Sequence, residues 1–220
     1  MKYISVAVDG PAGAGKSSVS KAVAKSLGYT YIDTGAMYRA VALFAINNGI
    51  DAKNETEKLI SRLNEVEIDI KYTDEGQQIY LLGENVSKRI REEDVSVGAS
   101  NVAVIPEVRK KLVELQRKMA ESANVIMDGR DICSYVLPNA DVKVYLTASV
   151  ECRAMRRFKE LEGRGEACDF EQIKQDIQER DERDMTREIA PLKQAEDATL
   201  IDSSEMGIDD VVKAIIALTK

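Results

Sequence analysis

The feature that most constrains this chain is a glycine-rich segment between a short apolar run and a helical pattern. Residues Tyr3–Val8 are apolar and β-branched, which predicts a buried strand. The segment Gly10–Ser17 follows, and a helical pattern extends from Lys16 through Leu27 and stops at Gly28. A strand, a tight loop and a helix in this order are typical of the start of an α/β fold.

Four further segments have the short, apolar character of the first strand, and helical patterns lie between them: Tyr29–Ile32, Val125–Met127, Val142–Leu146 and Thr199–Ile201. The sequence therefore predicts a three-layer α/β fold, in which helices cover both faces of a central parallel sheet of about five strands. A chain of 220 residues suits a single domain, over residues 1–220, of this type.

One region interrupts the alternation of strands and helices. Residues Glu67–Tyr72 and Gln77–Leu82 both resemble strands, and the turn-forming residues 73–76 between them predict a hairpin. Helices are expected on either side, over about Gly35–Asn48 and Asp94–Glu121. We therefore predict a small β/α subdomain, inserted at about residues 50–105 beside the sheet.

Composition limits the chemistry that is available to this chain. It contains 31 Lys and Arg against 38 Asp and Glu, a net charge of −7, so we expect no nucleic-acid partner bound by bulk charge. It has no His, which excludes Ser–His and Cys–His nucleophile pairs, and its three cysteines lack the spacing of a disulfide framework or a zinc site. No apolar run approaches the ~20 residues of a membrane span, so we expect no membrane contact and a cytoplasmic location. Nothing in the sequence requires an obligate protein partner.

The segment Gly10–Ser17 matches the phosphate-binding pattern G-x-x-x-x-G-K-[ST]. Its glycines let backbone N–H groups face a polyphosphate, and the helix that begins at Lys16 adds its positive end. Lys16 would reach the β- and γ-phosphates, and the Ser17 hydroxyl would bind Mg²⁺. The predicted ATP-binding residues run from the first glycine to the second serine: Gly10, Pro11, Ala12, Gly13, Ala14, Gly15, Lys16, Ser17 and Ser18.

Asp128 follows the Val125–Met127 strand, where a Walker-B carboxylate would organise Mg²⁺ and its waters. The alternative is an N-cap or turn aspartate that binds no metal. The phosphate-binding pattern by itself is shared by switch GTPases, motor ATPases, transporters and small-molecule kinases. The guanine-reading motif N-K-x-D is absent, and so is a transporter signature such as L-S-G-G-Q.

Arginine is concentrated in one part of the chain, because seven of the 14 arginines lie between residues 151 and 187. Two groups have helical spacing and would each share one helix face: Arg153, Arg156 and Arg157, and Arg180, Arg183 and Arg187. Between them, the polar stretch Leu161–Asp169 contains two glycines. We predict a mobile lid at about residues 155–169, whose arginines neutralise transferring phosphates. The alternative is a pair of solvated helices linked by surface ion pairs.

Four motifs together resemble the bacterial cytidylate kinase family of P-loop nucleoside monophosphate kinases: DGPAGAGKSS from Asp9, DTGAMYR over 33–39, DGRD over 128–131, and RDERD over 180–184 followed by Arg187 and Ala190-Pro191-Leu192. The resemblance extends over nearly the whole chain. It implies a P-loop kinase fold, in which the inserted subdomain binds a monophosphate and the short lid closes over the nucleotides. It also implies ATP-dependent phosphorylation of CMP and dCMP to CDP and dCDP, with Mg²⁺ as cofactor.

The resemblance assigns roles to individual residues. Those expected to bind CMP are Thr34, Arg39, Ser100, Arg109, Arg130, Asp131, Arg180, Asp184 and Arg187. Ser100, Arg109 and Asp131 would face the cytosine ring. The acceptor phosphate would be held by Thr34, Arg39, Arg130 and Arg187, and Arg180 and Asp184 would engage phosphate and sugar. Those expected to act on the transferring phosphoryl group are Lys16, Arg130, Arg153, Arg157 and Arg187. The chain departs from the family at Cys133, where glycine is usual, and this change would shift the turn or narrow the floor of the pocket.

Two other functions stay open. The first is a P-loop kinase for another small acceptor, such as UMP, another nucleoside monophosphate or dephospho-coenzyme A. The second is a non-catalytic protein that senses nucleotide through its phosphate loop. A panel of acceptors separates the kinases from one another, and ADP release that depends on the acceptor excludes the sensor.

Overall fold

The computed structural model describes residues 3–73 and 76–219, and the chain divides into two compact units. Unit 1 comprises Met1–Tyr31 and Ala120–Lys220, and unit 2 comprises Ile32–Met119. Unit 2 is larger than the insertion predicted at residues 50–105, because it also contains the helices on either side of that segment. The centre of the predicted hairpin turn, residues 74 and 75, lies outside the described residues.

The central sheet has five strands in the order β2-β6-β1-β7-β8, and all but the second half of β2 belong to unit 1. In that order the strands span Thr30–Asp33, Val125–Gly129, Ser5–Asp9, Val142–Thr147 and Thr199–Asp202. β1 pairs in parallel with β6 and β7, and β7 pairs in parallel with β8. The predicted α/β class is confirmed, and each predicted strand is present with its ends moved by at most two residues.

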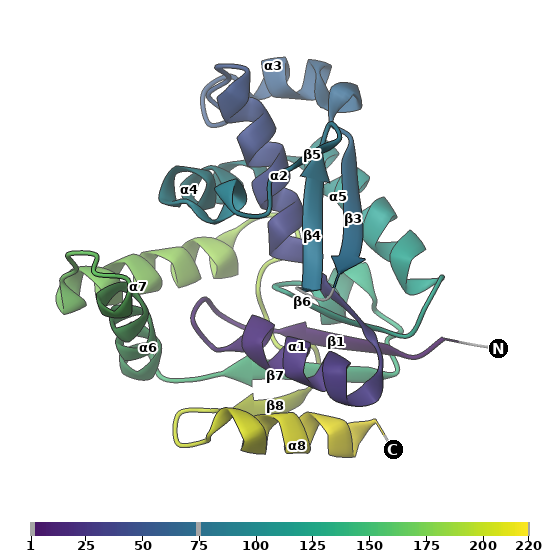
Figure 1. The fold of residues 1–220 in the computed structure, drawn as a ribbon, viewed down its shortest axis with the longest axis vertical. Coiled ribbons are helices and arrows are strands. Elements are labelled where there is room, and N and C mark those ends of the chain that lie inside the picture. The colour runs from purple at the N-terminus through teal and green to yellow at the C-terminus, as the bar shows by residue number, and fades with distance from the viewer. Residues whose placement is uncertain (1–2, 74–75, 220) are drawn as a thin grey trace. The chain divides into compact units, whose positions relative to one another are not determined.

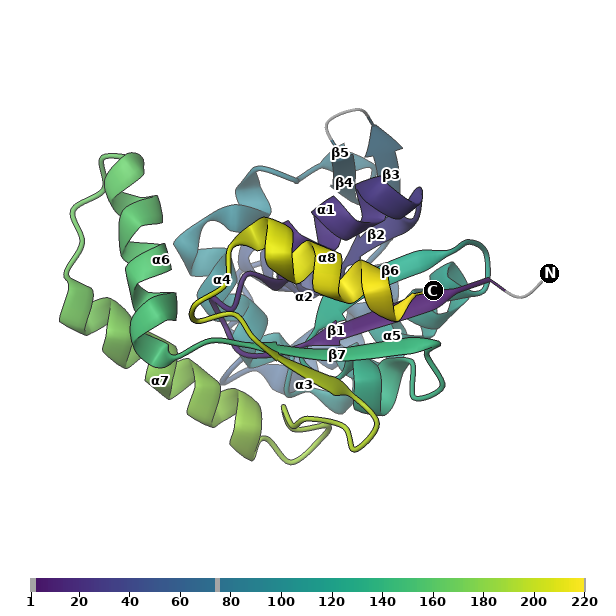
Figure 2. The same ribbon diagram turned by 90° about the horizontal axis from the view of Figure 1, so that it is seen from below.

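Apolar side chains from the strands and from two helices form the core of unit 1. α1 (Lys16–Leu27) and α8 (Ile208–Leu218) contact each other and pack against the sheet (Figures 1 and 2). Val6, Val144 and Ile215 are fully buried in this core. The continuous apolar runs of β1 and β7 therefore lie where a buried parallel sheet requires them.

Two helices follow β7 and contact each other, and their axes are inclined to one another (Figures 1 and 2). They are α6 (Val150–Gly163) and α7 (Phe170–Thr186). The loop between them covers only residues 164–169, so the predicted polar stretch from Leu161 begins inside α6. The rings of Phe158 and Phe170 meet edge to face, with 6.2 Å between their centroids, and hold the two helices together near this loop.

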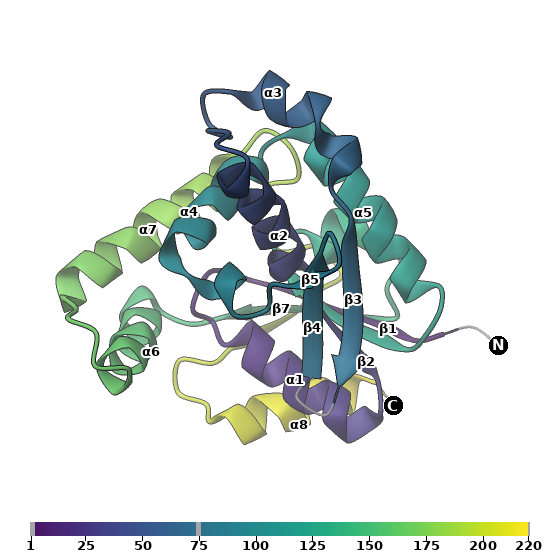
Figure 3. The ribbon, with the colours of Figure 1, turned by 45° about the horizontal axis from the view of Figure 1, so that its top comes forward.

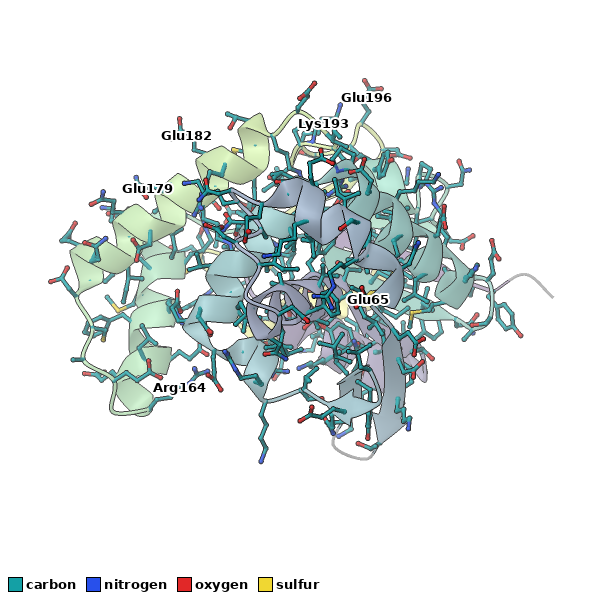
Figure 4. The ribbon with its side chains drawn as sticks, turned by 90° about the horizontal axis from the view of Figure 1, so that it is seen from above. Glu65, Arg164, Glu179, Glu182, Lys193 and Glu196 are labelled. Atoms are coloured by element: carbon teal, nitrogen blue, oxygen red, sulfur yellow. The ribbon has the colours of Figure 1, made fainter. Side chains whose placement is uncertain are left out.

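α7 has one buried face and one solvated face. Ile173, Ile177 and Asp181 recur every four residues and are its buried positions. Figure 4 shows Glu179 and Glu182 pointing away from the helix on its outer side. One face of α7 is thus a solvated surface, as the ion-pair alternative expects, and the other contacts α6 through the buried carboxylate of Asp181.

Unit 2 is built around α2 (Thr34–Asn47), a helix with an almost continuous apolar sequence. α4 (Glu93–Val102) crosses α2 closely, since a Cβ on Gly98 would lie 3.2 Å from the Cβ of Ala42. The predicted hairpin is confirmed as β3 (Ile68–Thr73) and β4 (Gly76–Leu81), which pair antiparallel beside α2 (Figure 3). The sequence did not predict two short elements of this unit, which are α3 (Thr56–Ser61) and β5 (Glu84–Asn85).

One predicted helix is wrong in its extent. The single helix expected over Asp94–Glu121 is two helices, α4 and α5 (Pro106–Ala120), with a break at residues 103–105. Pro106 explains the break, because proline lacks a backbone N–H and disfavours helical backbone at the residue before it, here Ile105. Proline is well tolerated as the first residue of the second helix.

Candidate active site

The loop between β1 and α1 follows a path that only glycine permits at two positions. Gly10 leaves β1 so close to β7 that a Cβ on it would lie 1.9 Å from the carbonyl oxygen of Leu146. Gly15 precedes α1 with φ of 89°, in the left-handed region that other residues adopt at a cost. The structure therefore explains the first and last glycines of the phosphate-binding pattern by backbone geometry.

Lys16 is the first residue of α1, and its side chain folds back over the loop. Its Nζ donates to the carbonyl oxygens of Gly10 and Pro11, at 2.7 Å in each case. Burial, and next the charge of Arg130, hold the pKa of Lys16 well below its usual value. Phosphate oxygens are stronger acceptors than carbonyl oxygens, so a polyphosphate at this loop would favour the charged amine.

The two residues predicted to hold Mg²⁺ lie together. The Ser17 hydroxyl donates to Oδ2 of Asp128 at 2.7 Å, and the Tyr31 hydroxyl donates to Oδ1 of the same carboxylate at 2.8 Å. In the described part of the chain, no three His, Cys, Asp or Glu residues cluster as a metal cage. A hydroxyl and a carboxylate are hard oxygen ligands, and they suit a cation such as Mg²⁺ that keeps several waters and takes others of its ligands from phosphates.

Asp9 is a buried carboxylate to which the sequence analysis assigned no role. It ends β1 and accepts the backbone N–H groups of Ile132 at 2.8 Å and Cys133 at 2.7 Å. Burial raises the pKa of Asp9 to about 6, although these two hydrogen bonds act in the opposite direction. Asp9 therefore fixes the π-helical turn over residues 132–136, which begins two residues after Arg130. The feature of the sequence that could have identified Asp9 is an acidic residue directly after an apolar strand.

The departure from the family pattern at Cys133 is accommodated by packing. The cysteine is buried, and its Sγ lies 3.5 Å from the carbonyl oxygen of Ala7 and 3.6 Å from that of Val144. Burial, and next the charge of Asp9, raise the pKa of the Cys133 thiol. The side chain therefore lies against β1 and β7 as an unreactive thiol.

Four of the residues predicted to bind CMP in unit 1 form two ion pairs. Arg130 Nε donates to Oδ2 of Asp184 at 2.7 Å, and Arg187 Nη2 lies 3.3 Å from Oδ1 of Asp131. Burial opposes a negative charge on Asp184, but the neighbouring cations outweigh it and lower its pKa, with Arg130 first, then Arg180 and Arg187. The structure thus brings together five of the residues predicted to bind CMP: Arg130, Asp131, Arg180, Asp184 and Arg187.

Arg153 connects α6 to the phosphate loop and to α7. Its Nη1 is 2.6 Å from Oδ2 of Asp181 and donates to the carbonyl oxygen of Ala12 at 3.0 Å. Its Nε donates to the carbonyl oxygen of Ala148 at 2.9 Å. The guanidinium of Arg153 is buried, so this predicted lid arginine is part of a fixed network at the base of α6.

The other two arginines of this group on α6, Arg156 and Arg157, differ in their hydrogen-bond partners. Arg156 donates to the carbonyl oxygen of Ala14 at 3.3 Å and to that of Ser203 at 2.7 Å, although the sequence analysis gave it no role in the site. Arg157, which it did select, is half-buried and pairs with Glu160 at 3.1 Å. The contact of Arg157 with a transferring phosphoryl group stays a prediction.

In unit 2, the residues predicted to bind phosphate lie at the start of α2. Asp33 caps this helix by accepting the backbone N–H of Ala36 at 2.9 Å. Its second oxygen accepts from Arg39 Nη2 at 3.0 Å. Thr34 is buried as the first residue of the helix. The structure therefore brings Thr34 and Arg39 to one helix end.

The remaining two predicted residues flank the break between α4 and α5. Ser100 lies near the end of α4 and is partly buried. Arg109 lies in α5 with a buried side chain, and its Nη1 donates to the carbonyl oxygen of Ala103 at 3.3 Å.

Comparisons with known proteins agree over nearly the whole chain. A family model described as cytidylate kinase matches residues 6–220. A cytidylate kinase of Caldicellulosiruptor bescii is 50% identical over 218 residues, which cover 99% of this chain and 96% of that protein. A cytidylate kinase of Anoxybacillus flavithermus is 48% identical over 219 residues, with coverage of 100% and 97%. An uncharacterized protein from Eubacterium ventriosum, whose crystal structure is known, shares the fold with a TM-score of 0.54 and 11% identity, over 97% of this chain and 96% of that one.

Proposed function

This chain belongs to the cytidylate kinase family, and from that premise we propose that it transfers the terminal phosphoryl group of ATP to CMP and dCMP, giving CDP and dCDP. The observation that carries the proposal is the charge around the phosphate loop. Lys16 is buried at the loop, and the charge of Arg130 lowers its pKa, so two cations occupy one small region. Such a region favours an anion such as a polyphosphate, beside the carboxylates of Asp9, Asp128 and Asp184 that already lie near Lys16.

The proposed reaction needs alignment and charge neutralisation, with no covalent intermediate. A nucleotide phosphate is itself a competent nucleophile, so catalysis consists of holding donor and acceptor in line. Lys16, Arg130 and Arg187 would neutralise charge on the transferring group, and Arg153 and Arg157 would join them from α6. Asp184 and Asp131 hold Arg130 and Arg187 in place beforehand, which reduces the reorganisation that the reaction requires.

We propose that Ser17 and Asp128 hold the Mg²⁺ that accompanies ATP, because their oxygens are 2.7 Å apart at the end of the phosphate loop. When bound, Mg²⁺ supplies positive charge to the phosphate oxygens of the donor. Tyr31 orients the carboxylate of Asp128 from its other oxygen, so the ligand keeps one orientation.

For the acceptor we propose the residues that the family resemblance implies. Thr34 and Arg39 would bind the phosphate, and Ser100 and Arg109 would face the cytosine ring. Asp131 would accept from the cytosine amino group, which is a donor. The charged groups proposed to bind the phosphate and the sugar are Arg130, Arg180, Asp184 and Arg187.

ATP and CMP as substrates favour a cytoplasmic location, which is part of the proposal. Over the described residues, the helices are each too short or too polar to cross a bilayer. No nucleic-acid partner and no protein partner is part of the proposed activity.

The test is ADP release from ATP and Mg²⁺ with one acceptor at a time: CMP, dCMP, UMP, AMP, GMP and dephospho-coenzyme A. We expect rapid ADP release with CMP and dCMP and slow release with the others. A different preferred acceptor would support another small-molecule kinase. ADP release that is the same with and without acceptor would contradict phosphoryl transfer to a nucleotide.

A further inference from the structure

A glutamine of the hairpin in unit 2 is hydrogen-bonded to the start of α2. The backbone N–H of Asp33 donates to Oε1 of Gln77 at 2.9 Å. A backbone N–H can only donate, so the amide oxygen of Gln77 must face Asp33 and its Nε2 must face the other way. That Nε2 is buried and has no hydrogen-bond partner among the described residues. The hairpin thus presents a buried donor whose orientation is determined by its own oxygen.

Arg39 presents a second buried donor to the same cluster. Its Nη2 is 3.0 Å from Oδ2 of Asp33, while its Nε is buried and has no hydrogen-bond partner in the part of the chain that the structure describes. Burying a donor without an acceptor costs free energy. Gln77 and Arg39 each bury one such donor, and both residues are hydrogen-bonded to Asp33. Their common requirement is a ligand rich in acceptor oxygens.

The backbone beside this cluster leaves no room for a side chain. A Cβ on Gly35 would lie 3.2 Å from Nη1 of Arg39 and 3.3 Å from Oδ1 of Asp33, which is closer than ordinary contact. A larger residue at position 35 would therefore push against the guanidinium of Arg39. This glycine keeps the Asp33–Arg39 pair in its present geometry.

We propose that Gln77 is a residue of the acceptor-phosphate site. Its amide oxygen positions Asp33, whose carboxylate holds Arg39, and its amide nitrogen donates to a phosphate oxygen of the acceptor. This inference rests on the proposed function, in which Thr34 and Arg39 bind the phosphate of CMP. It gives the hairpin, a segment with no assigned role, a direct contribution to acceptor binding.

The test is steady-state kinetics on Gln77→Glu and Gln77→Met. Glutamate keeps an oxygen that accepts the Asp33 N–H but replaces the donor with a negative oxygen, and methionine keeps the volume of glutamine without either polar group. We expect the KM for CMP to rise by about tenfold or more in both variants and the KM for ATP to stay unchanged. The melting temperature should stay unchanged in Gln77→Glu and fall in Gln77→Met, which removes the acceptor of the Asp33 N–H.

The matched control is Gln78→Glu. Gln78 is the next residue of β4, and its side chain points to the opposite face of the hairpin, where its Oε1 accepts from Asn85 Nδ2 at 3.4 Å. Gln78→Glu makes the same change of charge as Gln77→Glu, but on the opposite face of the hairpin. Equal effects at both positions would overturn the proposal, because the effect would then come from net charge or hairpin stability.

A titration of the wild-type protein does not depend on the activity of the variants. The side-chain amide resonance of Gln77, identified by its loss in Gln77→Glu, is followed by ¹⁵N NMR during titration with CMP and, separately, with cytidine. We expect a shift with CMP and none with cytidine, which lacks the phosphate. An unshifted resonance at saturating CMP would overturn the inference.

The outcomes separate this inference from the proposed function. A wild-type enzyme that phosphorylates CMP while both Gln77 variants stay within about twofold of its KM for CMP overturns the inference alone. A wild-type protein that does not phosphorylate CMP overturns the proposed function, and with it the inference that depends on it.

Discussion

Asp9 and Lys16 flank the six loop residues Gly10–Gly15, and both are buried ionisable groups. Lys16 is bound to two backbone carbonyl oxygens, and burial disfavours its charge. Asp9 is bound to two backbone N–H groups, and burial disfavours its charge as well. The first interaction holds a cation beside the loop, and the second holds the turn that follows Arg130.

Replacing the loop lysine tests whether the phosphate loop is the donor site. Lys16→Ala should lower kcat by more than about a hundredfold, since one preorganised cation at a transferring phosphoryl group is worth ~3 kcal/mol or more. The melting temperature should change little, because the amine contacts only loop carbonyls. Lys25→Ala, at an exposed position of the same helix, is the control. Substantial activity in a folded Lys16→Ala protein would show that ATP binds elsewhere.

The buried aspartate predicts a dependence of stability on pH. Asp9 loses its proton near pH 3.8 when the chain is unfolded and near pH 6 when it is folded, so the folded state binds the proton more tightly. The free energy of unfolding should therefore fall by ~3 kcal/mol from this group as the pH rises from about 4 to about 6. Urea unfolding at several pH values measures it.

Asp9→Asn removes this titration while leaving the other carboxylates in place. The difference in unfolding free energy between wild type and Asp9→Asn should change over the same pH interval and be constant above it. Carboxylates of lowered pKa, such as Asp184, contribute the opposite slope at lower pH, but they cancel in this difference. Parallel curves for the two proteins from pH 4 to pH 7 would contradict the buried, proton-binding state of Asp9.

At the scale of elements, α6 carries two arginines that spacing alone made equivalent. Arg153 is buried against Asp181 of α7 and the carbonyl oxygen of Ala12, whereas Arg157 is half-buried beside Glu160. Helical periodicity predicted that they share a face, but it contains no information about which neighbouring helix covers that face. The alternative of a solvated, ion-paired helix therefore describes Arg157 as the structure places it, and not Arg153.

Kinetics and stability together distinguish the roles of these two arginines. If both reach the transferring group when the lid closes, Arg153→Ala and Arg157→Ala should lower kcat much more than they weaken CMP binding, and lysine at either position should restore only part of kcat. Only Arg153→Ala should also destabilise the fold, by about 3–5 kcal/mol, because it leaves the buried Asp181 without its partner.

Steady-state kinetics and urea unfolding of the four variants supply these values, with Arg117→Ala as a control outside both arginine groups. Wild-type kcat in Arg153→Ala and Arg157→Ala would assign both residues to structure alone. Arg130, Arg180 and Arg187 would then be the remaining arginines for charge neutralisation from unit 1.

At the scale of the whole molecule, the sequence predicted the class of fold and the order of its strands along the chain, because buried parallel strands are continuous apolar runs. It missed the break before Pro106, where helical periodicity continued across a residue that cannot continue the helix. It also missed Gln77 and Asp9, whose partners lie 44 and 123 residues away along the chain. Such contacts depend on how distant elements pack, and neither spacing nor composition contains that information.

The measurement that tests the central claim most directly is the ratio of kcat/KM for CMP to that for UMP, with saturating ATP and Mg²⁺. UMP has a carbonyl oxygen in place of the cytosine amino group, which would face the Asp131 carboxylate with an acceptor instead of a donor. A buried mismatch of this kind costs ~1 to 3 kcal/mol, so the ratio should be about ten or more. A ratio near one would contradict the assignment of this site to cytosine nucleotides.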